Sequence, residues 1–296
     1  MLVKIYRRIL PLAFRQKMYD AFLGRVLEFF RNLPLLTTGL FYYLFGRFMR
    51  GNEKNLAYAF IGKHGMTSYP FPASLSYSHL KVDVEWDKES KLPYVQHLGK
   101  KLFFPEHFSV DKVRTEYLRL LIEQDPQSPH RYIPSYDELE NRVLLDVGAA
   151  EGIFALDTIE LVTRVFLFEY EEFWQKPLLQ TFKPWQEKVS IVRKFVSDRT
   201  ENLNVSIDDF LKGKEHEKLF IKMDIEGAER KALQGARAIL QSAGDIYLSV
   251  CGYHRKGDPE YITGFVKEYG FSHEFAPGYL VWNRRLSKAV IRCHKN

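Results

Sequence analysis

The sequence contains few cysteines, since only Cys251 and Cys293 occur in 296 residues. Two thiols in a chain of this length cannot form a disulfide framework, which excludes a small disulfide-built fold and favours a reducing compartment. A secretory signal is also lacking, because charged residues interrupt the N-terminal segment MLVKIYRRIL and no small-residue cleavage site follows it. We therefore expect a cytoplasmic protein.

Residues 1–50 lack an apolar run long enough to span a bilayer. The run LPLLTTGLFYYLF at residues 33–45 has thirteen residues, whereas a spanning helix needs about 20. Pro34 and Gly39 interrupt this run and predict two or three short helices instead of one continuous helix.

Positive charge is concentrated in residues 1–50. This segment contains nine Lys or Arg against two acidic residues, although the whole chain carries only +6. Basic residues mixed with Leu, Phe and Tyr suit a helix lying at the inner face of an anionic membrane. An amphipathic extension packed on the main domain or on a partner subunit, including a homo-oligomer, is the alternative.

The rest of the chain has no excess of basic residues, which argues against a nucleic-acid enzyme. Its composition, with 46% hydrophobic and 27% charged residues in the whole chain, is that of a globular protein with a proper core. We divide the chain into a basic helical extension (1–50), a linker with an accessory α/β segment (51–140) and a catalytic core (141–296).

From residue 141 onward, short apolar runs alternate with helical patterns, which predicts a parallel sheet covered by helices. The expected strands are 142–147, 165–169, 190–195, 219–223 and 246–250, followed by a hairpin of 272–275 with 279–283. The expected helices are 153–162, 173–181, 228–241 and 259–269. A further helix is expected over 110–124, and short β segments over 82–86 and 101–104.

The first core strand leads into DVGAAEG, where Asp146, Gly148 and Gly152 stand at the turn into a helix. Glycines in such a turn let the backbone approach a ligand, and Glu169 at the end of the next strand can accept both ribose hydroxyls. A dinucleotide turn would need GxGxxG, and an acid before the loop would repel a pyrophosphate but attract the ammonium of a methionine. S-adenosylmethionine therefore fits better than NAD, although an NAD-dependent enzyme stays as an alternative.

The chain resembles the FkbM family of S-adenosylmethionine-dependent methyltransferases over roughly residues 96–296. The resemblance depends on a series of segments that occur in the family's order: EQDPQSPHRY, LLDVGAAEGIFAL, FLFEYEEFW, FVSD, IDDF, IKMDIEGAERKALQGA and YHRKGD. It implies an α/β fold, the class I methyltransferase (Rossmann-like) seven-stranded sheet with helices on both faces and strand order 3-2-1-4-5-7-6. Residues 1–50 have no counterpart in it and are expected to form a helical N-terminal extension.

The resemblance also implies cofactor-binding residues. Asp146, Gly148 and Gly152 would line the methionine moiety, Glu169 would hold the ribose, and Ser197 and Asp198 would lie beside the adenine.

The proline-bounded loop EQDPQSPHRY has two interpretations. It could reach the cofactor's carboxylate through Arg131 or the amide of Ser128, or it could only pack against the core, with His130 satisfied there.

Methyl transfer to an alcohol requires an in-line geometry and removal of the hydroxyl proton. Asp224 and His254 follow the fourth and fifth core strands, so we expect them to be catalytic, with His254 as general base. Alternatively, Asp224, Glu226 and His254 could bind Mg²⁺ or another divalent cation that acidifies the hydroxyl. For Glu229 we expect only a favourable charge at the start of a helix.

These observations lead to one expected function. We expect a transferase that methylates a hydroxyl of a saccharide or glycoconjugate, which the basic N-terminal segment would suit if that acceptor were linked to a lipid. A lipid or polyketide hydroxyl is an alternative acceptor. A membrane-peripheral protein that only senses the cofactor is an alternative from another class.

Overall fold

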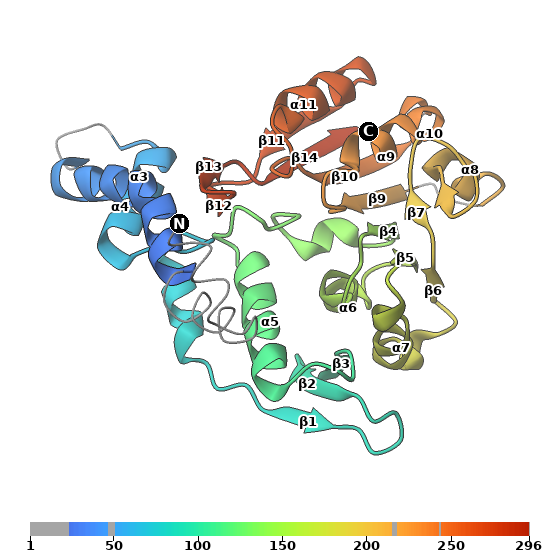
Figure 1. Ribbon diagram of the computed structural model, residues 1–296. Helices are drawn as coiled ribbons and strands as arrows, with labels where there is room; N and C mark the ends of the chain where they lie inside the picture. Colours follow the sequence, from blue (N-terminus) through green and yellow to red (C-terminus); the bar gives the residue numbers. More distant parts are fainter. Residues whose placement is uncertain (1–23, 47–50, 215–217, 243, 296) are drawn as a thin grey trace, which may run out of the picture.

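The computed structural model describes residues 24–46, 51–214, 218–242 and 244–295. A seven-stranded sheet forms its centre, in the order β11-β14-β10-β9-β4-β5-β6. Its strands are β4 (Val143–Val147), β5 (Arg164–Phe168), β6 (Val189–Val192), β9 (Lys218–Met223), β10 (Asp245–Cys251), β11 (Ser272–Phe275) and β14 (Val290–Lys295). Numbered along the core, this is the predicted order 3-2-1-4-5-7-6, so the predicted fold class is confirmed (Figure 1).

The five adjacent strands from β10 to the edge strand β6 are parallel, and β14 runs antiparallel to both β10 and β11. Alternate residues point to opposite faces of the sheet, as the pleat of a strand requires. Leu144 joins one buried cluster and Leu145 the other. Both faces are therefore covered, which explains the continuous apolar runs in the sequence.

Helices cover both faces. On one side lie α5 (Val110–Glu123), α6 (Ile153–Thr158) and α7 (Glu172–Thr181), and on the other lie α8 (Ile207–Leu211), α9 (Glu229–Gln234), α10 (Arg237–Gln241) and α11 (Asp258–Glu268). The helix predicted over 228–241 is thus two helices. The reason is Asp208, whose carboxylate accepts hydrogen bonds at 2.9 Å from the amides of Ala238 and Ile239 and so caps a new helix there.

The predicted hairpin of 272–275 with 279–283 was wrong. β11 pairs with β14, while β12 (Leu280–Trp282) pairs with β13 (Arg285–Ser287). Asn283 and Arg284 both have positive φ, at 45° and 61°, which is the backbone of a two-residue hairpin turn. The hairpin therefore forms within residues 280–287, and residues 290–295 supply the missing strand of the sheet.

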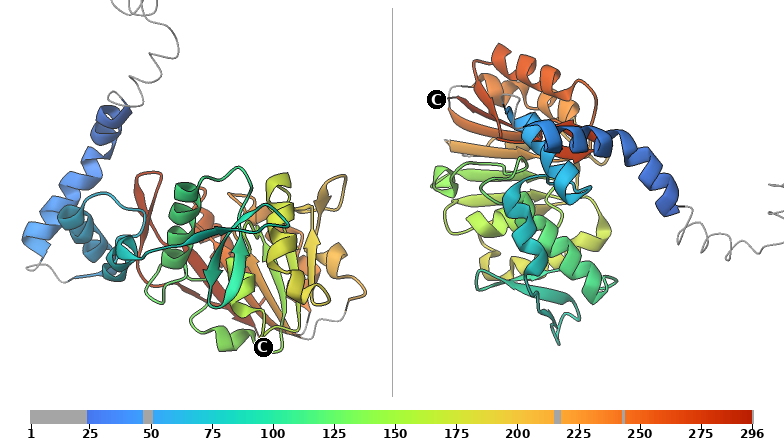
Figure 2. Two further views of the ribbon diagram at one scale, coloured as in Figure 1. Left: turned by 90° about the horizontal axis from the view of Figure 1, so that it is seen from below. Right: turned by 90° about the vertical axis from the view of Figure 1, so that its left-hand side faces the viewer.

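The described part of the N-terminal extension is one helix, α3 (Gly24–Phe45), so the prediction of several short helices was wrong. It packs against α4 (Glu53–His64), and both helices lie to one side of the sheet (Figure 2). Gly39 lies in the contact, because a Cβ on it would stand 2.8 Å from the Gly62 nitrogen. Gly39 thus allows the close packing of α3 against α4, and the helix continues through it. The hydroxyl of Thr38 donates to the Pro34 carbonyl at 2.8 Å, inside the helix.

The remainder of the predicted extension, residues 1–23 and 47–50, lies outside the described residues. Across the part of the chain that is described, no helix is both long and apolar enough to cross a membrane.

An accessory three-stranded antiparallel sheet precedes the core. It consists of β1 (Val84–Trp86), β2 (Pro93–His97) and β3 (Lys100–Phe103), following the 3₁₀ helix η3 (Pro72–His79). Buried His97 joins it to the core, with Nδ1 2.9 Å from the Tyr117 hydroxyl and Nε2 2.5 Å from Asp157 Oδ1. Shorter elements complete the fold: η4 (Tyr136–Leu139), η5 (Lys183–Trp185), and the parallel pair β7 (Phe195–Val196) and β8 (Asn204–Val205).

Candidate active site

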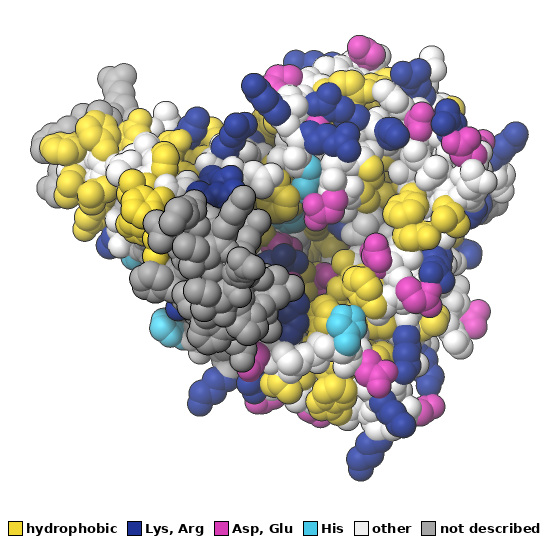
Figure 3. Space-filling view, in the orientation of Figure 1, with side chains coloured by type: hydrophobic (Ala, Val, Ile, Leu, Met, Phe, Trp, Pro, Cys, Tyr) yellow, Lys and Arg dark blue, Asp and Glu magenta, His cyan; other side chains and the backbone are white. Residues whose placement is uncertain are grey.

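A cavity of about 680 Å³ opens where β4, β5 and β9 end. Segments far apart in the sequence form its wall, and the surface is hollowed in this region (Figure 3). The residues that line it include Tyr69, Arg119, Glu123, His130, Tyr132, Gly148, Glu151, Glu169, Tyr170, Phe195, Ser197, Lys222, Asp224, Glu226, Lys231, Tyr253 and Trp282. Its position is that of the ligand site in open α/β sheets, outside the carboxyl ends of the strands.

Gly148 begins the loop after β4 and has a φ of 82°. A Cβ at this position would lie 2.0 Å from the Asp224 carbonyl oxygen, so only glycine fits. The amides of Gly148 and Ala149 donate to the Phe168 carbonyl at 3.0 and 3.1 Å. The loop is thus fixed to the end of β5, and these two amides are already used within the protein.

Glu169 faces the cavity from the end of β5. Its Oε2 accepts a hydrogen bond from the Ala150 amide at 2.9 Å, and its Oε1 accepts one from the Glu171 amide at 2.7 Å. Burial raises the pKa of this carboxyl, and the two amides act in the opposite direction. The side chain is therefore held with both oxygens fixed at the mouth of the loop.

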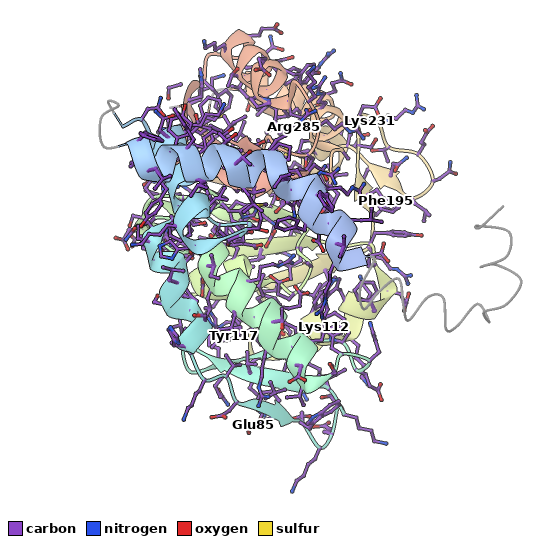
Figure 4. The ribbon with its side chains drawn as sticks, turned by 60° about the vertical axis from the view of Figure 1, so that its left-hand side comes forward. Glu85, Lys112, Tyr117, Phe195, Lys231 and Arg285 are labelled. Carbon is purple, nitrogen blue, oxygen red and sulfur yellow. The ribbon has the colours of Figure 1, made fainter. Side chains whose placement is uncertain are left out.

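Of the two residues predicted to lie beside the adenine, only one lines the cavity. Ser197 lines the cavity and donates to Asp198 Oδ1 at 3.0 Å, whereas Asp198 itself is exposed and does not line the cavity. Tyr170 and Phe195 stack beside Ser197 with ring centroids 3.9 Å apart. Phe195 and Lys231, labelled in Figure 4, also belong to the cavity wall. The sequence analysis did not identify these aromatic rings.

Asp146 does not line the cavity, although the sequence predicted that it would contact the methionine moiety. It is 1% exposed, and its Oδ1 accepts from Lys222 Nζ at 2.8 Å. Lys222 also donates to the Gly148 carbonyl at 2.6 Å. Burial opposes the lysine's charge, but the Asp146 carboxylate outweighs it and raises the pKa of Lys222. The ion pair supports the loop from behind.

Three other predicted cofactor residues also lie away from the cavity wall. Arg131 donates to the Gln124 carbonyl and stacks on Tyr136, and the Ser128 amide donates to the Asp125 carbonyl at 2.8 Å. Gly152 faces the side chains of α7. The residue that the proline-bounded loop does bring to the cavity is His130.

Asp224 occupies the end of β9 and lines the cavity. Its Oδ2 accepts from the Tyr132 hydroxyl at 2.8 Å and lies 3.5 Å from His130 Nε2. Its Oδ1 lies 3.5 Å from His254 Nε2. Burial alone would raise the pKa of Asp224, but electrostatic interactions with His130, Lys222 and His254 outweigh it and lower this pKa. Asp224 is therefore an ionised group between two histidines.

His254 lies behind Asp224 and is not part of the cavity wall. Its Nδ1 lies 2.8 Å from Glu229 Oε1, and Glu229 is fully buried. Burial opposes protonation, but the hydrogen bond to Glu229 and the nearby carboxylates outweigh it and raise the pKa of His254. Glu229 therefore orients the histidine, and the expectation that it only contributes charge at a helix start was wrong.

The structure also brings together the residues expected to bind a cation. His254 Nε2 lies 3.7 Å from Glu226 Oε2, in addition to its contact with Asp224. This nitrogen is buried and has no hydrogen-bond partner among the described residues, as a metal-ligating atom would without its metal. Glu226, however, is 80% exposed. The more compact group of possible ligands is Asp224, Glu229 and His254.

Part of the cavity wall comes from residues that were not predicted as site residues: Tyr69, Arg119, Glu123, Tyr253 and Trp282. Tyr69 donates to Glu123 at 2.7 Å, and Arg119 lies 3.5 Å from the same carboxylate oxygen. Tyr253 and Trp282 face each other with ring centroids 5.0 Å apart. The helical pattern of 110–124 predicted α5 but gave no signal that its residues would reach the cavity.

Comparison with known proteins agrees with this geometry. The family model described as the methyltransferase FkbM domain matches residues 96–272, more than half of the chain. A comparison with curated proteins found no match.

Solved structures of other proteins are similar to parts of this chain. The FkbM methyltransferase of Methylobacillus flagellatus KT is 20% identical over 63% of this chain and 55% of that chain, with a TM-score of 0.43. A precorrin-6y C5,15-methyltransferase of Geobacter metallireducens GS-15 is 15% identical over 54% and 82%, with a TM-score of 0.38. SMU.1697c of Streptococcus mutans, in complex with SAH, is 14% identical over 54% and 95%, with a TM-score of 0.38. The chain thus spans about half the length of the Methylobacillus protein.

The family match covers the loop after β4, Glu169, Asp224 and His254 in one continuous segment. The chain belongs to the FkbM family of methyltransferases.

Proposed function

We propose that this methyltransferase transfers a methyl group from S-adenosylmethionine to a hydroxyl of a saccharide or glycoconjugate. The observation that carries this proposal is the position of Asp224. It lines the same cavity as Glu169 and the Gly148 loop, and its carboxylate oxygens lie 3.5 Å from His130 Nε2 and 3.5 Å from His254 Nε2.

The residues of the cavity fit the cofactor. Its volume of about 680 Å³ is in the range of sites for small molecules and cofactors. Glu169 has both carboxylate oxygens fixed at the strand end, where they can accept the two hydroxyls of a ribose. Tyr170 and Phe195 offer apolar surface beside Ser197 for an adenine. When bound, S-adenosylmethionine supplies an electrophilic methyl carbon on a sulfonium.

An alcohol that accepts a methyl group loses one proton, and Asp224 with His254 is placed to receive it. Asp224 touches the cavity and accepts the hydrogen bond of the hydroxyl. The hydroxyl proton would pass to the Asp224 carboxylate as the O–H bond breaks, and the carboxyl would in turn give a proton to Nε2 of neutral His254, 3.5 Å from Asp224 Oδ1, while Glu229 holds Nδ1. Because the pKa of His254 is raised, its neutral form predominates only at a higher pH than for an ordinary imidazole.

A divalent cation is the second way to acidify the hydroxyl. Asp224 and His254 would hold it, with Glu226 closing from the exposed side, and the unpartnered Nε2 of His254 is the observation that favours it. Such an ion would stabilise the alkoxide directly. Transfer that resists prolonged treatment with a chelator would exclude this alternative.

The acceptor side of the cavity is aromatic. Tyr69, Tyr253 and Trp282 line it, and large rings of this kind pack well against the apolar face of a sugar. The acceptor class itself follows the family resemblance. A fatty or polyketide hydroxyl is the alternative acceptor, and the assay below distinguishes the two.

We further propose that the acceptor is linked to a lipid at the inner face of a membrane. Helix α3 exposes apolar side chains along its length, among them Phe30 at 61%, Leu40 at 49% and Phe45 at 50%. The first 50 residues also carry nine basic and two acidic residues, which favours anionic headgroups.

Co-sedimentation with vesicles tests this membrane proposal. Binding to vesicles rich in phosphatidylserine, weakened by Phe30→Ser together with Leu40→Ser, is the expected result. Self-association through α3 without vesicle binding would refute it and indicate a homo-oligomer.

The test of the function is a transfer assay with the full chain, S-adenosylmethionine and glycan extracts from the producing cell. We expect a product heavier than the acceptor by one CH₂ group, formed by the wild type and much more slowly by His254→Ala. Methylation confined to a lipid or polyketide extract would refute the saccharide assignment. Cofactor binding without transfer to any acceptor would indicate a protein that only senses the cofactor.

A further inference from the structure

We propose that Glu151 binds the positively charged amino group of the cofactor's methionine end. This inference rests on the proposed function, and the role is the one predicted for Asp146 in the sequence analysis. It concerns the loop after β4, where the methionine moiety of the cofactor is expected.

Asp146 cannot take this role without losing its partner. It is 1% exposed and does not line the cavity, and its carboxylate already holds Lys222 at 2.8 Å. An ammonium of the ligand would have to replace a buried lysine that also supports the Gly148 carbonyl. A different anion must therefore meet the ligand's charge.

Glu151 is the carboxylate of the same loop that does line the cavity. The residue is 9% exposed, and among the described residues its carboxyl has a hydrogen bond only with its own backbone amide. Glu123, on the facing wall, differs because it accepts from the Tyr69 hydroxyl at 2.7 Å and faces Arg119. Of the two, only Glu151 lacks a partner from another residue.

The electrostatics of the loop agree with this geometry. Burial raises the pKa of Glu151 to about 8, with Glu123 adding to the shift and Lys222 and Arg119 opposing it. The free protein therefore holds this carboxyl mostly protonated at neutral pH. An ammonium that enters the cavity would stabilise the ionised form, so that binding releases the proton.

Calorimetry with two ligands tests the pairing. The ligands are S-adenosylhomocysteine and its analogue with 4-mercaptobutyrate in place of homocysteine, which lacks only the amino group. We expect the wild type to prefer S-adenosylhomocysteine by about 10- to 100-fold, the range of a charge-assisted hydrogen bond. In Glu151→Gln the preference should fall below about threefold, whereas Glu123→Gln should keep it.

Proton release gives a second measurement that a purely structural role would not change. With a pKa of about 8, binding at pH 7 should release about 0.9 proton more in the wild type than in Glu151→Gln. The value follows from calorimetry in buffers of different ionisation enthalpy.

The outcomes separate this inference from the proposed function. Equal ligand preference and equal proton release in the wild type and Glu151→Gln would overturn the role of Glu151 and leave the methyltransferase assignment intact. Failure of the wild type to bind either ligand would contradict the proposed function itself, and the inference with it.

Discussion

Replacing Lys222 by Met tests whether the buried ion pair holds the cofactor loop in place. Lys222 is 4% exposed and Asp146 is 1% exposed. The lysine connects the Asp146 carboxylate with the Gly148 carbonyl, at 2.8 and 2.6 Å. The substitution leaves a carboxylate without a counter-charge inside the core and removes the hydrogen-bond donor to the Gly148 carbonyl.

The expected cost is about 3–5 kcal/mol in the free energy of unfolding, because one partner of a buried pair is removed. That is a large part of a typical total of about 5–15 kcal/mol. Without Lys222, burial and the nearby Asp224 carboxylate act on Asp146 unopposed and raise its pKa further. The Asp146 carboxyl then binds its proton more tightly in the folded than in the unfolded state. The loss in the free energy of unfolding therefore grows as pH rises above about 4.

Urea unfolding followed by circular dichroism, at pH 5 and pH 8, measures both effects. The double variant Asp146→Leu with Lys222→Met should be more stable than the sum of the single variants by about 2 kcal/mol or more, because no unpaired charge remains. A cost below about 1 kcal/mol for Lys222→Met, or additive single effects, would refute the reasoning.

Three further predictions concern the same site. Gly148→Ala should lower affinity for S-adenosylhomocysteine at least about tenfold by calorimetry, since its Cβ would meet the Asp224 backbone at 2.0 Å; unchanged affinity would contradict the loop geometry. Glu151→Gln should stabilise the ligand-free protein at pH 8 by several degrees in Tm, and hardly at pH 5, because a carboxyl with a pKa of about 8 destabilises the fold as pH rises; a pH-independent change would count against it. The kcat of the wild type should rise with pH through a pKa above 6.5, and Glu229→Gln should move this rise to lower pH, because Glu229 stabilises the charged His254; an identical midpoint in both proteins would exclude His254 as the base.

The sheet could be predicted because its strands are buried on both faces. Runs such as LFIKM in β9 are apolar apart from one residue, and they alternate with helical patterns, which fixes the class of fold. The final strand was missed because VIRCHK in β14 mixes apolar and basic residues. Its place is set by pairing with β10 and β11, which no local pattern shows.

Lys222 carried a signal that was overlooked. A lysine inside an otherwise buried strand must find an acid, and Asp146 at the end of the adjacent strand is the acid in reach. Asp146 was predicted to bind the methionine moiety of the cofactor, whereas its carboxylate pairs with Lys222.

Side-chain direction could not be read from the loops. The loop of residues 128–131 was expected either to reach the cofactor or to pack against the core. His130 lines the cavity, whereas Arg131 donates to the carbonyls of Gln124 and Pro134. Glu229 occupies a helix start, as expected, but its contact with His254 joins α9 to the end of β10. Contacts of this kind depend on tertiary packing, so local propensity alone does not reveal them.

Binding of S-adenosylhomocysteine to the full chain tests the central claim most directly. A crystal grown with it should show the molecule in the cavity at the ends of β4 and β5, with its ribose hydroxyls on Glu169, and Glu169→Ala should abolish detectable binding in calorimetry. An empty cavity in that crystal, or a Glu169→Ala variant that binds as tightly as the wild type, would contradict the account.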